Sequence, residues 1–181
     1  MFELFQIPAF RTLFTAQIIA LIGTGLTTIA LALLAFELAG NEASIVLGTA
    51  LAIKMIAYVI ISPAITGLIR HKHQKQCLIL FDLLRAIFVM LLFFVTSVWQ
   101  IYVLIFFLQA FSAGFTPIYQ SVISDILKED RLFIKGASLS RIAYNLENIL
   151  SPTFALLILT FINYSSFFIA NTICFFLSAA L

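Results

Sequence analysis

The sequence has few charged residues: Asp, Glu, Lys and Arg together make up 10% of its 181 residues. A soluble globular domain carries about 25%. Hydrophobic residues make up 63% of the chain, and 20 residues are phenylalanine. A water-soluble core of this size cannot hide so much apolar surface, so lipid must solvate much of it. The composition therefore excludes an ordinary soluble domain and indicates a membrane protein whose first partner is the lipid bilayer.

Cysteine and net charge are also low. Cys77 and Cys174 fall in different apolar runs and give no disulfide framework. The formal net charge of +2 does not indicate a nucleic-acid partner. The sequence shows no Ser-His-Asp set, phosphate-binding loop or metal-ligand set, and the bases around His71 and His73 would repel a metal ion. We therefore predict neither an enzyme nor a bound cofactor or metal.

Long apolar runs dominate the rest of the chain. A helix that spans a bilayer needs about 20 mostly apolar residues, and alternating strand patterns are absent, so helices must satisfy the backbone in lipid. The sequence predicts an all-α membrane protein, a single six-transmembrane-helix bundle that spans residues 1–181. Its helices are expected at about 13–38, 44–69, 77–98, 101–123, 137–162 and 165–181.

Most of the basic residues lie in or near the loops between these runs. If the N-terminus is cytoplasmic, nine of the ten Lys and Arg residues fall at or near cytoplasmic helix ends, and only Lys54 does not. The opposite side carries Glu37 and Glu42. This asymmetry is the pattern of the positive-inside rule, so we expect a cytoplasmic N-terminus. The nine residues are Arg11, Arg70, Lys72, Lys75, Arg85, Lys128, Arg131, Lys135 and Arg141.

Several stretches resemble the major facilitator superfamily. "FRTLFTAQIIALIGTGLTTIAL" is similar to the first helix of that superfamily. "FDLLRA", "VWQIYVLIFFLQAFSAGFTPIYQ" and "ASLSRIAYNLENILSP" are similar to later helices of bacterial enterobactin-exporter-like permeases. The resemblance implies the N-terminal half of a secondary transporter, built of two inverted three-helix repeats. It also implies a bacterial inner membrane and a C-terminal six-helix half that this chain does not include.

The chain departs from the superfamily's motifs in three places, and in the fifth helix only Pro152 matches the Gly-rich antiporter motif. In the loop motif after the second helix, Arg70 stands at the position of an Asp that contacts the other half, and His73 stands at a Gly position. In the fourth helix, Leu108 stands nearest the Arg position of the drug-antiporter motif. The motifs therefore do not assign a drug–proton antiport mechanism.

Two expected helices carry a polar stripe. Side chains three, four or seven residues apart share one face of a helix. Each stripe either lines an aqueous substrate cavity or forms hydrogen bonds between packed helices; we expect the substrate cavity, because the stripes recur on repeat-equivalent helices of the resembled fold. The stripe residues are Gln17, Thr24 and Thr28 in the first helix, and Gln109, Ser112, Thr116 and Gln120 in the fourth.

Charges inside the expected membrane spans form a second group of candidates. Lys54 and Glu147 fall near mid-depth of the second and fifth helices. A lone charge at the bilayer centre costs at least about 2.5–3.5 kcal/mol, so such residues usually face a cavity or a partner. They either contact substrate or a coupling ion, or pair for structure alone, with each other or with the missing half.

A third group lies near the expected cytoplasmic helix ends. Asp82 and Arg85 are three residues apart and can pair on one face. Together with Arg70, Asp125 and Arg141 they are expected to form a cytoplasmic gate network.

The sequence thus predicts a major facilitator-type secondary transporter that exports a small organic molecule. The alternative is a six-helix non-transport membrane protein, an accessory or sensor subunit that pairs with a second copy of itself.

Overall fold

The computed structural model describes residues 2–68, 73–160 and 163–181. These residues form seven α-helices and one 3₁₀ helix with no strand, which confirms the all-α prediction. The elements are α1 (Phe2–Phe5), α2 (Pro8–Ala39), η1 (Gly40–Glu42), α3 (Ala43–Leu68), α4 (Gln74–Leu92), α5 (Val98–Ile126), α6 (Asp130–Leu159) and α7 (Ser165–Ala180). Each of the six apolar runs forms most of one long helix, from α2 to α7 in chain order.

Local sequence explains where several helices begin and end. Pro8 opens α2, a position where its missing N–H costs nothing. The helix ends at Gly40, whose φ of 52° is one that glycine adopts without strain. Before α5, Ser97 and Gln100 form a capping box, in which the Ser97 backbone N–H donates to Gln100 Oε1 at 3.1 Å. This cap fixes the start of α5 at Val98, before the predicted start near 101. α4 ends at Leu92, earlier than the predicted end near 98.

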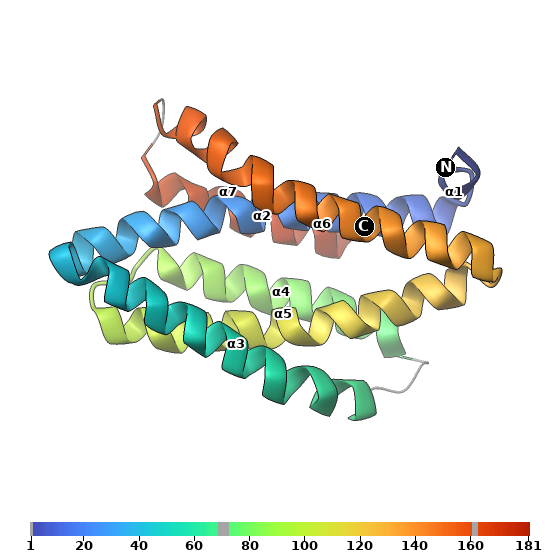
Figure 1. Ribbon diagram of the computed structural model, residues 1–181, viewed down its shortest axis with the longest axis horizontal. Coiled ribbons are helices and arrows are strands. Elements are labelled where there is room, and N and C mark those ends of the chain that lie inside the picture. Colours follow the sequence, from blue (N-terminus) through green and yellow to red (C-terminus); the bar gives the residue numbers. More distant parts are fainter. Residues whose placement is uncertain (1, 69–72, 161–162) are drawn as a thin grey trace.

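The long helices lie roughly alongside one another in an elongated bundle (Figure 1). α2 packs against α7, α6 and α3, while α5 packs against α3 and α4, and α4 packs against α7. Two hydrophobic clusters fill the interior. One includes Ala30, Val89 and Phe167, and the other includes Phe10, Ile123 and Leu127.

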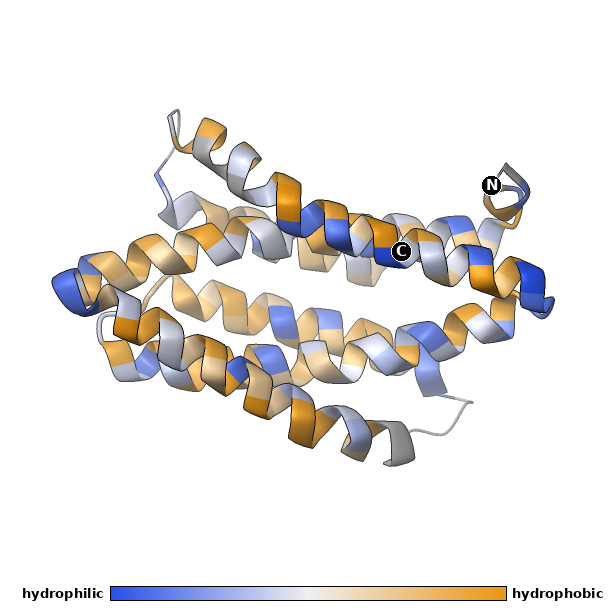
Figure 2. Ribbon diagram, in the orientation of Figure 1, coloured by the Kyte–Doolittle hydropathy of each residue, from blue (hydrophilic) through white to orange (hydrophobic). Residues whose placement is uncertain are grey.

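Charge separates the two ends of the bundle. The end that holds the starts of α2, α4 and α6 carries Arg11, Lys75 and Lys128, and we call it the basic end (Figure 1, right). The other end holds η1 and carries Glu37 and Glu42, and we call it the acidic end. Figure 2 shows hydrophilic residues at both ends and predominantly hydrophobic residues along the helices between them.

The lateral surface is apolar. Val59 and Ile149, for example, are 74% and 70% exposed. Two stretches of the described chain, Pro8–Ile65 and Val98–Ile126, are long and apolar enough to cross a membrane, and the first contains α2 and most of α3. Such a surface is stable in lipid rather than in water.

Two glycines let α6 and α7 approach α2. A Cβ atom at Gly23 would collide with Asn171 and Cys174 of α7, and one at Gly25 would collide with Ser151 of α6. Small residues allow such close backbone approach between membrane helices. Gly23 and Gly25 therefore serve the packing of α2 against α7 and α6.

We predict that Gly25→Leu destabilises the folded protein by about 1–3 kcal/mol, because the new side chain overpacks the contact between α2 and α6. Gly48→Leu is the matched control, since a Cβ atom at Gly48 meets nothing within 4 Å. Unfolding of both variants by heat or denaturant in one detergent gives the comparison. Equal stability of the two variants would contradict the close approach at Gly25.

The charge separation predicts the orientation of the bundle. In a variant without Cys77 and Cys174, a membrane-impermeant thiol reagent added outside intact cells should label Asn41→Cys and miss Lys128→Cys, because the basic end remains in the cytoplasm. Permeabilised cells provide the control, since both exposed positions should then react. Labelling of Lys128→Cys alone in intact cells would reverse the orientation.

Candidate functional site

A buried ion pair lies inside the bundle, between α4, α5 and α7. Asp82 and Arg85 are 3% and 6% exposed, and one guanidinium N–H of Arg85 donates to Asp82 Oδ1. Ser178 of α7 donates its hydroxyl to Asp82 Oδ2 at 2.6 Å. The Arg85 guanidinium carbon lies 4.3 Å from the ring centre of Phe115 and 4.6 Å from that of Phe175. The carboxylate and two aromatic rings thus compensate the cation where water is scarce.

Asp82 and Arg85 lie further from the start of their helix than the sequence predicted. α4 already begins at Gln74, so Arg85 is about three turns from its start rather than near a cytoplasmic helix end, and the expectation for Arg85 was wrong in this respect. Arg141 also lies about three turns into α6, where it is exposed. Asp125 is exposed in the last turn of α5. Of the four members of the predicted gate network that the structure describes, Asp82 and Arg85 are buried, and Asp125 and Arg141 are exposed.

Three residues with predicted roles lie outside the described part of the chain. They are Arg70, the fifth member of the gate network, His71 and Lys72, which fall in the gap between α3 and α4. The other histidine, His73, is exposed, and its Nδ1 lies 3.0 Å from Gln76 Oε1.

The predicted polar stripes lie on half-buried and exposed parts of α2 and α5. Gln17, Gln109 and Ser112 are half-buried. The other four stripe residues, Thr24, Thr28, Thr116 and Gln120, are exposed. Their location suits either a wet cavity or a contact with another part of the protein, so cavity lining remains a prediction.

All four stripe hydroxyls donate hydrogen bonds within their own helix. Thr24 donates to the Ala20 carbonyl at 2.9 Å, and Thr28 donates to the Thr24 carbonyl at 3.1 Å. In α5, Ser112 and Thr116 donate in the same way to carbonyls four residues earlier, at 2.9 and 3.3 Å. These contacts leave the hydroxyl oxygens as acceptors on the helix surface.

Gln17 belongs to a different arrangement, a polar contact between three helices. The Tyr119 hydroxyl of α5 donates to Gln17 Oε1 of α2 at 2.5 Å, and it lies 3.4 Å from the Ser140 hydroxyl of α6. Tyr119 and Ser140 are buried. The contact links the first stripe to the interior, and sequence spacing gave no signal for either partner.

Lys54 and Glu147 are half-buried, and the structure brings them within electrostatic reach of each other. Lys54 is about three turns from the start of α3, and Glu147 is about three turns from the end of α6. Glu147 accepts a hydrogen bond from Ser151 at 3.2 Å and lies beside Gly25 of α2. The two charges thus lie at one level of the bundle, and Glu147 lies at the close approach of α2 and α6 beside Gly25.

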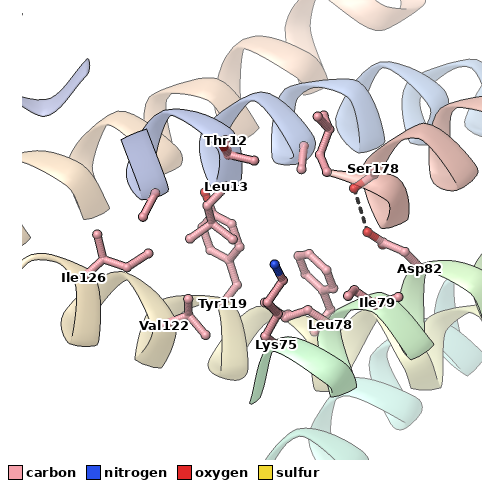
Figure 3. Close-up of a pocket in the computed structure, with 14 residues that line it drawn as sticks. Thr12, Leu13, Lys75, Leu78, Ile79, Asp82, Tyr119, Val122, Ile126 and Ser178 are labelled. Atoms are coloured by element: carbon pink, nitrogen blue, oxygen red, sulfur yellow. Dashed lines mark hydrogen bonds between the residues drawn. The ribbon is translucent and has the colours of Figure 1, made fainter. Parts of the chain in front are cut away.

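A cavity of about 400 Å³ opens beside the buried ion pair, between α2, α4, α5 and α7. Its walls are largely aliphatic, and its polar lining residues are Thr12, Lys75, Asp82, Tyr119 and Ser178 (Figure 3). None of the seven stripe residues lines this cavity. Of the predicted site residues that the structure describes, Asp82 alone lines it. The other lining residues come together only through the packing of four helices.

The long apolar helices and the ion pair buried among them define an α-helical membrane protein. The sequence matches the family model of the Major Facilitator Superfamily over residues 13–181, and the chain belongs to this superfamily of membrane transporters. No curated protein and no solved structure matches the chain.

We predict that Asp82→Asn destabilises the protein by about 3–5 kcal/mol, because it leaves the Arg85 charge buried without its counter-ion. The double variant Asp82→Asn/Arg85→Met removes both charges and should lose less than the sum of the two single variants. Exposed Glu129→Gln is the control and should change stability by less than about 0.5 kcal/mol. Strictly additive losses in thermal or denaturant unfolding would show that the two charges do not depend on each other.

Proposed function

We propose that this chain is the N-terminal six-helix half of a secondary transporter that exports a small organic molecule by alternating access. Its place is the inner membrane of a bacterium, with the N-terminus in the cytoplasm. Membership of the Major Facilitator Superfamily supports transport. The similarity of several stretches to enterobactin-exporter-like permeases supports export.

The helix contacts support an internal repeat. If α2, α3 and α4 are exchanged with α5, α6 and α7, the contact of α2 with α7 becomes that of α5 with α4, and both occur. Likewise, the contact of α3 with α5 becomes that of α6 with α2. This exchange of contacts is what two inverted three-helix repeats would produce.

The observation that carries the proposal is the pair of charges on repeat-equivalent helices. Lys54 of α3 and Glu147 of α6 lie at one level and within electrostatic reach, although both are only half-buried. Such charges at membrane depth are costly unless water, substrate or a partner charge reaches them. We assign the two residues to contact with substrate or a coupling ion, and the stripes of α2 and α5 to the wall of the substrate cavity.

We predict that Glu147→Gln leaves the protein folded and inserted but abolishes or uncouples transport, and that Lys54→Met weakens transport more than it lowers expression. The measurement uses enterobactin as the probe. Its efflux from cells that express the intact protein is followed with and without a proton gradient. Exposed Glu129→Gln and Lys128→Met are matched controls and should transport normally.

Three results would count against this assignment. Wild-type transport by both variants, with and without the gradient, would show that the charges have no transport role. Loss of both single variants from the membrane, with recovery in the double variant, would make them a structural ion pair. A homodimer of the chain that moves none of a panel of organic ions would favour the accessory or sensor subunit.

A further inference from the structure

The cavity beside the ion pair has one uncompensated charge among its described lining residues. The Asp82 carboxylate at its inner wall already pairs with Arg85 and accepts from Ser178. Lys75 also lines the cavity, and no hydrogen bond or ion pair of Lys75 occurs among the residues that the structure describes. Figure 3 shows its ammonium nitrogen extended into the space between α2, α4 and α5. The net electrostatic character of the cavity is therefore positive.

The hydroxyl groups that line the cavity also donate their hydrogen bonds to other partners. Thr12 donates to the Pro8 carbonyl at 3.1 Å, and Tyr119 donates to Gln17. Lys75 is thus the group that remains to hold the polar part of a ligand, and an ammonium prefers an anionic oxygen. The rest of the wall, which includes Leu13, Leu78 and Ile126, offers apolar surface for an alkyl chain.

We propose that this cavity binds an amphipathic anion, with a carboxylate or phosphate head on Lys75 and an alkyl chain along the aliphatic wall. Its volume of about 400 Å³ falls in the range of small-molecule sites, about 300–1,000 Å³. The cavity lies at the basic end of the bundle, where anionic lipid heads would gather around the basic side chains. The proposal does not rest on transport, because none of the stripe residues, Lys54 or Glu147 lines the cavity.

A ligand in this cavity would affect the polar stripe of α2 through one hydrogen bond, the bond between Tyr119 and Gln17. Tyr119 lines the cavity and holds Gln17 through its hydroxyl. A bound alkyl chain that packs against the Tyr119 ring would restrict the ring and, through it, the Gln17 amide. The site is therefore placed to couple the presence of an amphiphile to the polar face of α2.

The test uses dodecyl phosphate as the probe and the intact protein in nanodiscs of phosphatidylcholine. Native mass spectrometry measures the retained probe, and the thermal midpoint measures the stabilisation that binding to the folded state produces. We expect one retained molecule per chain. Lys75→Gln should weaken binding about tenfold or more, the value of one charge-assisted hydrogen bond. Lys128→Gln, an exposed lysine at the same end, is the matched control and should bind normally.

A second pair of variants tests the apolar part of the site. Ala16 lines the cavity, and Ala16→Phe should fill it and remove binding. Ala52→Phe places the same ring on an exposed position of α3 and should leave binding unchanged. If Ala16→Phe does not fold, Lys75→Gln decides alone, because Lys75 is exposed and its replacement leaves the core intact.

The outcomes separate the possibilities. Unchanged binding by Lys75→Gln, or equal binding of dodecanol or dodecyltrimethylammonium, would overturn the proposal. If nanodiscs that contain phosphatidylglycerol displace the probe, the natural ligand is an anionic lipid of the bilayer. If they do not, while Lys75→Gln still weakens binding, the ligand is a free amphiphile such as a fatty acid.

Discussion

The arrangement of α4, α5 and α7 depends on the need to stabilise the buried guanidinium of Arg85. An arginine with 6% exposure in an apolar bundle is stable only if an anion and polarisable groups surround it. The anion is Asp82, one turn away on the same helix, and Ser178 orients its second oxygen. The rings come from Phe115 and Phe175. α4, α5 and α7 are therefore held in one register by a single side chain, and the adjacent cavity takes its shape from the same contacts.

α2 is the helix on which the rest of the bundle is assembled. It contacts α3, α5, α6 and α7, and its glycines bring α6 and α7 close where Glu147 and Asn171 lie. Asn171 of α7 donates to Thr27 of α2 in the buried interface. The polar residues of α2 thus hold helices together on one side and are exposed on the other. A change in the tilt of α2 would alter both sides at once.

The presence of long apolar helices was predictable from the sequence, because the length of an apolar run is a local property. Several of their ends were not, since α6 begins at Asp130 rather than near 137 and α4 ends at Leu92 rather than near 98. The hydrogen-bond partners of Gln17 and Asp82 could not be predicted from the sequence. Tyr119 and Gln17 are 102 residues apart, and Ser178 and Asp82 are 96 apart, so only the packing of whole helices brings them together. The position of Arg85 along its helix was predicted wrongly for a local reason. The polar residues Gln74, Lys75 and Gln76 form the first turn of α4, although their polarity is typical of a loop.

The hydroxyl groups of Thr24, Thr28, Ser112 and Thr116 have a chemical consequence beyond helix geometry. Each donates its hydrogen bond to a carbonyl of the preceding turn. What these four side chains present to a neighbour is therefore lone pairs, and a hydroxyl in this state complements N–H and O–H groups rather than carbonyls. Along these two helices, donors can therefore come only from other side chains, such as the amides of Gln109 and Gln120.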